Sequence, residues 1–155
     1  MGFFSSPQAF SSADETWRTP RFLFEQLNGE YQFKLDAAAL QCSTLVPGNW
    51  YGPDHPDVSR RDAFLRDWCA DAGGEPVFLN PPYGRGIGRW MEKALFSSRA
   101  GCVVVCVVPA RTDTGWWHDF VIDGGASVTF LRGRLRFNDG PNAAPFPSAV
   151  VRFGR

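Results

Sequence analysis

The run CVVVCVVPA, residues 102–110, constrains the fold more than any other part of this 155-residue chain. Its valines favour an extended strand, and neither face of that strand offers a polar side chain to solvent. A strand that is apolar on both faces must be covered on both, as in parallel sheets that lie between two layers of helices. We therefore predict a buried central strand in an α/β fold, with Cys102 and Cys106 packed in the core.

The other segments alternate between the patterns of helices and strands. Apolar residues at helical spacing predict helices that begin in TPRFLFEQL (19–27), cover IGRWMEKALFS (87–97) and lie near 114–121. Further strands are predicted in YQFKLDAAAL, ending at Asp36, and in VFL, SVTFLRG and SAVVRF. Residues 41–61 are rich in Pro and Gly and predict a loop, whereas residues 61–68 form a short element of undecided type. This order predicts a mostly parallel sheet with helices on both faces.

We expect a single domain over residues 1–155, because no internal repeat or linker divides the chain. Residues 1–16 are expected to form a flexible N-terminal tail. No segment reaches the roughly 18 apolar residues of a membrane span, and the N-terminus lacks a secretory pattern, so we expect a cytoplasmic protein. The four cysteines and two histidines show no metal-binding spacing, and no metal is expected.

The stretch NPPYG, Asn80 to Gly84, follows the predicted strand VFL directly. Pro81 and Pro82 have no N–H and fix φ near −65°, so strand pairing must stop there. Asn80 and Tyr83 are therefore carried on a stiff turn at the carboxyl end of a strand, which is where open α/β sheets bind their ligands.

This turn has a chemical use. The amide oxygen of Asn80 and the carbonyl oxygen of Pro81 can act as a fixed pair of acceptors, and an exocyclic amine on a planar base offers two hydrogens to them. The ring of Tyr83 would stack on that base. Both hydrogen bonds localise the nitrogen lone pair, which makes the amine a better nucleophile. The alternative is that NPPY is a structural turn.

Charge is distributed unevenly along the chain, although the net charge is +0. Residues 1–80 carry six Arg or Lys and eleven Asp or Glu, whereas residues 81–155 carry ten and five. Such an asymmetry favours a polyanionic partner for the basic half. The alternative is that these charges only solvate the surface.

The motif NPPY resembles that of the adenine-specific amino-methyltransferases, which read Asp/Asn-Pro-Pro-Tyr/Phe at this point. WRTP (17–20), FKLDAAA (33–39) and DAFL (62–65) are similar to other motifs of that family and occur in its order. The segments CVVVCVVPARTDTGWWHDF, LRGRLRF and APFPSAVV resemble more narrowly the small phage-encoded DNA N-6-adenine methyltransferases of the Dam type. The resemblance covers about residues 17–153.

This resemblance implies a minimal Rossmann-like methyltransferase fold that transfers a methyl group from S-adenosylmethionine to an adenine flipped out of double-stranded DNA. It also implies a phage or restriction-modification setting in a bacterial cytoplasm, and it leaves no separate target-recognition domain. The implied catalytic residues are Asn80, Pro81, Pro82 and Tyr83. The implied cofactor-binding residues are Trp17, Thr19, Pro20, Asp36, Ala37, Asp62 and Ala63.

Some of these residues have a structural alternative. Asp36 would cap a turn, Asp62 would cap a helix, and Trp17 would anchor the core. The first-strand turn reads DAAALQC where many methyltransferases have a Gly-rich loop. No acidic residue ends a second strand to bind the ribose, and Asp54 or Asp57 in the 41–61 segment could substitute for it. His118 is expected to be structural, since methyl transfer from a sulfonium needs no strong base.

Two other functions stay open. The same chemistry would serve a methyltransferase that acts on RNA or on a glutamine side-chain amide of a protein. A degenerate domain that binds DNA without turnover is the third reading.

The arginines of the second half are the candidate DNA contacts. Alternation along RGRLRF predicts Arg132, Arg134 and Arg136 on one face of a strand, where unpaired guanidinium groups require solvent or an anion. Arg85, Arg89 and Arg111 are expected at the same edge of the sheet as the NPPY turn. The alternative is a strand edge protected by charge.

Overall fold

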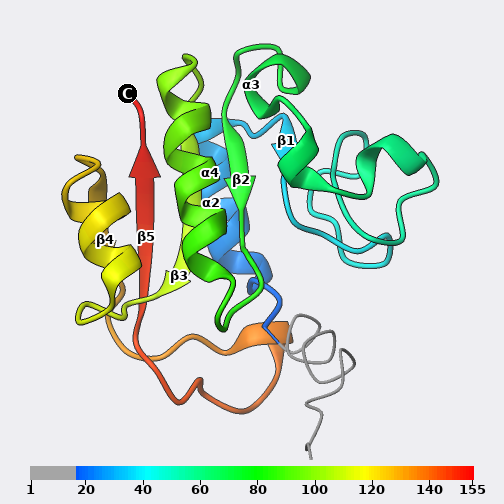
Figure 1. The fold of residues 1–155 in the computed structure, drawn as a ribbon. Coiled ribbons are helices and arrows are strands. Elements are labelled where there is room, and N and C mark those ends of the chain that lie inside the picture. The colour runs from blue at the N-terminus through cyan, green and yellow to red at the C-terminus, as the bar shows by residue number, and fades with distance from the viewer. Residues whose placement is uncertain (1–16) are drawn as a thin grey trace, which may run out of the picture.

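The computed structural model describes residues 17–155, which form one five-stranded sheet in the order β1-β2-β3-β5-β4 (Figure 1). Strands β1, β2 and β3 pair in parallel, and β5 runs antiparallel to both β3 and β4. Among the described strands only β5 therefore opposes the others, which confirms a mostly parallel, Rossmann-like α/β sheet. The strands are β1 (Leu35–Asp36), β2 (Val77–Leu79), β3 (Val104–Pro109), β4 (Ser127–Phe130) and β5 (Ser148–Phe153).

Strand β3 separates two apolar cores, as its sequence predicts. Val104, Cys106 and Val108 pack with helix α4 (Ile87–Arg99) in one core. Val105 and Val107 pack with helix α2 (Arg21–Tyr31) in the other core. The two helices thus cover opposite faces of the sheet (Figure 1). Cys102 and Cys106 are both buried free thiols, which confirms their packing role.

Helix α2 begins within residues 19–27 as predicted, but Thr19, a candidate N-cap by its residue type, does not occupy the cap position. Pro20 occupies the N-cap position and the helix begins at Arg21, without a hydrogen bond from a capping side chain of its own. Thr19 therefore does not cap the helix, and its buried hydroxyl oxygen has no hydrogen-bond partner in the part of the chain that the structure describes. The predicted strand from Tyr31 to Asp36 is also shorter. Tyr31 is the last residue of α2, and Gln32 turns the chain in a left-handed conformation with φ of 55°.

The segment between β1 and β2 has more structure than a loop. Trp50 forms a parallel β-bridge with Asp36, so residues 41–61 supply a single bridge at the edge of β1. The short element of undecided type at 61–68 contains one helical turn and ends where another begins. The helical segments are η1 (Val58–Arg60), η2 (Ala63–Leu65) and α3 (Trp68–Asp71).

Two predictions for the second half are confirmed in position but not in every detail. The helix near 114–121 is a π-helical segment, η3 (Trp117–Ile122), in which the amide of Asp123 donates to the carbonyl of His118 at 2.9 Å. The predicted strand SVTFLRG ends at Phe130, and the last ladder bond runs from the amide of Leu131 to the carbonyl of Ser148 at 3.0 Å.

Arg132, Arg134 and Arg136 consequently do not share the face of a strand. They are exposed in a loop, where the alternation arises because Leu135 and Phe137 are buried in the α2 core. The loop ends in a short helical turn, η4 (Phe137–Asp139).

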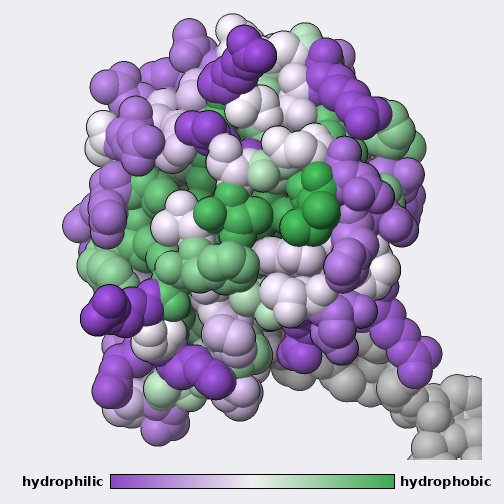
Figure 2. Space-filling view, turned by 90° about the vertical axis from the view of Figure 1, so that its left-hand side faces the viewer, coloured by the Kyte–Doolittle hydropathy of each residue, from purple (hydrophilic) through white to green (hydrophobic). Residues whose placement is uncertain are grey.

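The outer side of η3 and β4 carries an apolar patch surrounded by hydrophilic side chains (Figure 2). Ile122 of η3 is 55% exposed and Phe130 of β4 is 63% exposed. Neither of them lines the cavity that is described below. Within residues 17–155, no helix combines the length and the apolar character needed to cross a membrane. The expected tail over 1–16 lies outside the described residues.

Candidate active site

A cavity of about 500 Å³ opens at the carboxyl ends of β1 and β2, within the size range of small-molecule sites. Its walls come from parts of the chain that are distant in sequence: lining residues lie within 17–21, 36–45, 51–53, 61–64 and 78–83. Trp90 of α4 and, from the far end of the chain, Asn138 and Asp139 complete the walls. The predicted site residues on these walls are Trp17, Thr19, Asp36, Ala37, Asp62, Ala63, Asn80, Pro81, Pro82 and Tyr83. Pro20 is buried at the cap of α2 and does not line the cavity.

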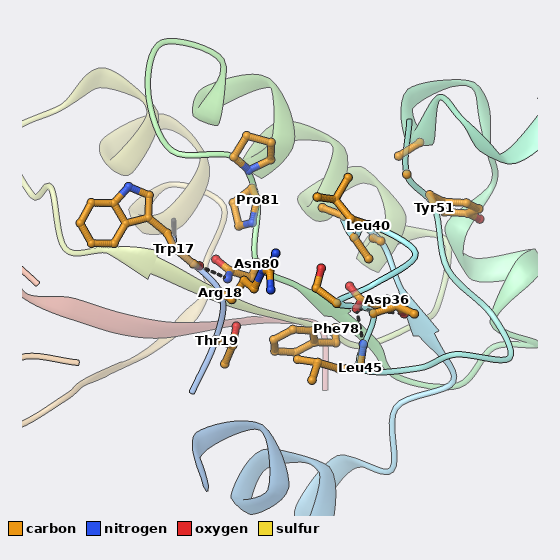
Figure 3. A pocket seen from close by; sticks show the side chains of 18 of the residues that line it. Trp17, Arg18, Thr19, Asp36, Leu40, Leu45, Tyr51, Phe78, Asn80 and Pro81 are labelled. Atoms are coloured by element: carbon orange, nitrogen blue, oxygen red, sulfur yellow. Dashed lines mark hydrogen bonds between the residues drawn. The ribbon is translucent and has the colours of Figure 1, made fainter. Parts of the chain in front are cut away.

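Asn80 follows the last residue of β2, and its side chain is held in one orientation. Its Nδ2 donates to the carbonyl oxygen of Trp17 at 2.7 Å (Figure 3). A carbonyl oxygen can only accept, so the NH₂ end of the amide must point to Trp17. The other end, Oδ1, is buried and has no hydrogen-bond partner among the described residues. A buried acceptor without a partner costs about 1–3 kcal/mol, so this atom is suited to a donor supplied by a ligand.

Asp36 ends β1 and is almost completely buried. Its Oδ2 accepts from the amide of Leu45 at 2.9 Å (Figure 3), whereas its Oδ1 is buried and has no partner within residues 17–155. Burial raises the pKa of this carboxyl from 3.8 to about 7, because the charged form loses its hydration. The capping alternative therefore explains only one of its two oxygens.

The turn after β1 lies close to the segment that contains the β-bridge. The amide of Ala39 donates to the carbonyl of Tyr51 at 2.9 Å. A Cβ on Gly52 would lie 1.9 Å from the carbonyl oxygen of Ala39, so only glycine fits there. Gly52 thus lets the neighbouring segment pack directly against the DAAALQC turn.

Tyr83 is anchored at both ends of its side chain. Its hydroxyl donates to the carbonyl oxygen of Val107 in β3 at 3.0 Å, and burial raises the pKa of the phenol. Its ring makes edge contacts with Phe137 and Phe146, with ring centres 6.0 and 5.7 Å apart. These contacts fix the ring in the cavity wall beside Asn80.

Trp17 is a core anchor that also borders the cavity. Its ring packs edge-on against Phe137 and Phe146 at 5.3 and 5.0 Å, as a core anchor would. Its carbonyl orients Asn80, and it also lines the cavity. Asp62 is likewise a helix cap, because its side chain accepts from the amide of Phe64 at 2.9 Å.

The chain matches the family model of DNA N-6-adenine-methyltransferase (Dam) over residues 7–148. It belongs to this Dam family. Membership implies a methyl donor of the S-adenosylmethionine type. No curated protein matches the chain. The solved structure of a candidate methyltransferase from Thermoplasma acidophilum is similar at 10% identity and a TM-score of 0.33, over 95% of this chain and 73% of that one. A likeness this low carries no argument.

The acidic residues considered for ribose binding in this Dam family member do not reach the cavity. Both oxygens of Asp54 accept from the amide of Gln41 at 3.1 Å, and Asp57 caps η1 through Ser59. Neither residue lines the cavity. His118 lies on η3, where its Nε2 is 2.8 Å from the carbonyl oxygen of Thr112, away from the cavity walls.

Tyr51 is a wall residue that the sequence did not single out. Its hydroxyl donates to the carboxylate of Asp71, which also forms an ion pair with Arg66 at 2.9 Å. Burial and the neighbouring Asp71 raise the pKa of this phenol, so it stays neutral. Trp50 and Tyr51 lie in a segment that the sequence predicts as a loop, and no motif there indicated a site.

The candidate DNA-binding arginines occupy three settings. Arg85 and Arg111 line a second, more open groove with Gly84, Pro109 and Trp116. Arg89 lies over the ring of Phe64 at 3.9 Å. Arg132 and Arg134 lie in the exposed loop after β4. Among residues 17–155, none of these five guanidinium groups forms an ion pair with an acidic side chain.

Proposed function

We propose that this chain transfers a methyl group from S-adenosylmethionine to the exocyclic amine of an adenine that has been flipped out of double-stranded DNA. The observation that carries the proposal is the Asn80 side chain, whose NH₂ end is held by Trp17 while its buried oxygen has no partner. Membership of the Dam family supports the same chemistry.

The walls of the cavity fit the methyl donor. Besides Asn80, two buried oxygens on these walls have no hydrogen-bond partner among the described residues: Thr19 Oγ1 and Asp36 Oδ1. A carboxylate oxygen without a partner suits a ligand that carries a cationic amino group. Thr19, Asp36, Ala37, Asp62 and Ala63 would hold the donor. When bound, S-adenosylmethionine supplies an electrophilic methyl group on a sulfonium sulfur.

The residues of the NPPY turn would prepare the nucleophile. Asn80 Oδ1 and the Pro81 carbonyl accept from the two hydrogens of the target amine, so the nitrogen lone pair is localised and directed along one line. A single preorganised hydrogen-bonding group of this kind is worth about 10²- to 10³-fold in turnover. Tyr83, held by Val107 and two phenylalanine rings, presents its ring beside this position.

DNA would approach along the groove of Arg85 and Arg111. Both arginines leave the turns that follow β2 and β3, so they flank the catalytic turn. Neither has an acidic partner among the described residues, and phosphate groups would supply one. Trp116, which is half-buried in the same groove, offers a ring to an unstacked base.

The proposal is tested by incubating the protein with tritiated S-adenosylmethionine and with duplex DNA, structured RNA or a mixture of unmodified proteins. We expect transfer to duplex DNA, recovered as N6-methyladenine by mass spectrometry after digestion, and no transfer by Asn80→Ala. If RNA or a protein glutamine is methylated and DNA is not, the substrate is that polymer and the DNA proposal is wrong. Binding of duplex without transfer to any polymer would favour the non-catalytic reading.

A further inference from the structure

The turn η4 is bonded to a part of the chain that lies about 120 residues earlier. Arg18 and Asn138 form a reciprocal pair: the Arg18 amide donates to Asn138 Oδ1 at 3.0 Å, and the Asn138 amide donates to the Arg18 carbonyl at 2.9 Å. One residue further on, Asp139 Oδ1 accepts from the amide of Arg21 at 3.0 Å. Asp139 thereby supplies the acidic cap that α2 lacks in its own sequence.

The backbone of this turn is strained. Asn138 and Asp139 are consecutive non-glycine residues with φ of 62° and 52°. Asn and Asp tolerate this left-handed region better than other residues, but two in succession persist only where their surroundings hold them. The bonds to Arg18 and Arg21 are such a constraint. Strain held in this way clusters at functional sites, and both residues line the cavity.

The turn acts on the cavity through Trp17, the residue before Arg18. Phe137 packs against the Trp17 ring at 5.3 Å, and the Arg18 pair fixes the main chain on the other side of the Trp17 carbonyl. That carbonyl accepts from Asn80 Nδ2. Through bonds and packing that the structure shows, the position of Asn138 therefore sets the position of the acceptor that orients Asn80.

We propose that Asn138 is a positioning residue for methyl transfer, which holds the Asn80 amide in its reactive orientation through the main chain of Arg18 and Trp17. The inference rests on the proposed function of Asn80. Asn138 need not touch either substrate, so its loss alters the rate at saturation rather than the affinity for the methyl donor or for DNA.

Two substitutions separate the side chain from the backbone. Asn138→Gly keeps the left-handed conformation and removes the oxygen that Arg18 needs, whereas Asn138→Asp keeps that oxygen. We expect Asn138→Gly to lower kcat by about 10- to 100-fold with KM for both substrates within about twofold, and Asn138→Asp to recover most of it. Asn142→Gly, an exposed asparagine in the same loop, is the matched control. A rise in KM for the donor with unchanged kcat would make Asn138 a ligand of the donor and overturn the inference.

A double-mutant cycle with Asn80→Ala distinguishes positioning from a general structural role. In the Asn80→Ala background the amide is gone, so Asn138→Gly should change kcat by less than about twofold. Equal losses in both backgrounds would mean that the turn acts through stability or through another residue.

A measurement without turnover keeps the inference separate from the proposed function. The side-chain amide protons of Asn80, assigned in a ¹⁵N correlation spectrum by their absence from Asn80→Ala, should shift and exchange faster with solvent in Asn138→Gly. They should stay unchanged in Asn142→Gly. If the wild type methylates no polymer and yet these signals respond, the proposed function fails while the positioning contact stands. Unchanged signals in Asn138→Gly would refute the positioning contact itself.

Discussion

Asn80 Nδ2 donates to the main-chain carbonyl of Trp17 at 2.7 Å, although 63 residues separate the two in sequence. This hydrogen bond makes the segment before α2 part of the site. It also gives the two ends of the Asn80 amide different roles. Nδ2 is bonded to the protein, whereas Oδ1 has no hydrogen-bond partner among the described residues.

Removal of the Asn80 side chain should abolish most of the turnover. We expect Asn80→Ala to lower kcat by about 10²- to 10³-fold, because the lost acceptor matters most in the transition state. Affinity for S-adenosylmethionine, measured by calorimetry, should change by less than about threefold. Asn142→Ala is the control on an exposed asparagine. Near-normal methylation by Asn80→Ala would remove Asn80 from the reaction.

The hydroxyl and the ring of Tyr83 should have different roles: the hydroxyl stabilises the fold, and the ring takes part in the reaction. Tyr83→Phe leaves the Val107 carbonyl without its donor, so it should lower the free energy of unfolding by about 1 kcal/mol while turnover stays within about threefold. Tyr83→Ala removes the ring as well and should lower turnover far more. Rates are compared below the unfolding temperature of both variants. Equal losses of turnover in Phe and Ala would assign the role to the hydroxyl.

The central part of the fold was predictable because its signals are local. The apolar run at 102–110 indicates a strand that is buried on both faces, and the two prolines after Asn80 indicate where strand β2 ends. Neither inference needs to know what lies elsewhere in the chain. NPPY likewise placed Asn80 and Tyr83 on the cavity wall correctly.

The failures share another cause. The alternation in RGRLRF was interpreted as a strand, but within the described residues the pairing with β5 ends at Leu131, and Leu135 is buried in the α2 core. Asn138 was not singled out because its contact with Arg18 spans 120 residues and no local pattern reports it. The one local indication is that Asn138 and Asp139 are residue types that tolerate a left-handed backbone in turns.

Asp36 should give the protein a pH-dependent stability. Its pKa is raised by burial from 3.8 to about 7, so between these values the folded state keeps a proton that the unfolded state has lost. The free energy of unfolding should therefore fall as pH rises from about 4 to about 7, by at most about 4 kcal/mol, and then level off. Asp36→Asn removes this ionisation and retains an acceptor for Leu45.

The check is urea unfolding of wild type and Asp36→Asn at about pH 5 and pH 8. The variant should gain stability relative to the wild type at the higher pH. An equal difference between the two proteins at both pH values would show that the carboxyl ionises in the folded state much as it does in the unfolded chain.

The DNA path should run past the groove of Arg85 and Arg111 rather than along a strand face. Each phosphate contact that is lost should lower the slope of log affinity against log salt by about one, because fewer counterions are released. We expect this for Arg85→Ala and Arg111→Ala in fluorescence anisotropy on a duplex over a salt series, with cofactor affinity unchanged. Arg99→Ala is the matched control, because Arg99 ends α4 at the opposite edge of the sheet.

Arg132→Ala and Arg134→Ala decide how far the contact extends. These side chains lie in the loop after β4, whose carboxyl end is at the same edge as those of β2 and β3. If they also flatten the salt slope, the duplex spans both the groove and the loop. A relaxed sequence preference at an unchanged slope would instead mean that the loop reads a base. Wild-type slopes in Arg85→Ala and Arg111→Ala, with reduced slopes in the two loop variants, would move the duplex off the groove and refute the path proposed here.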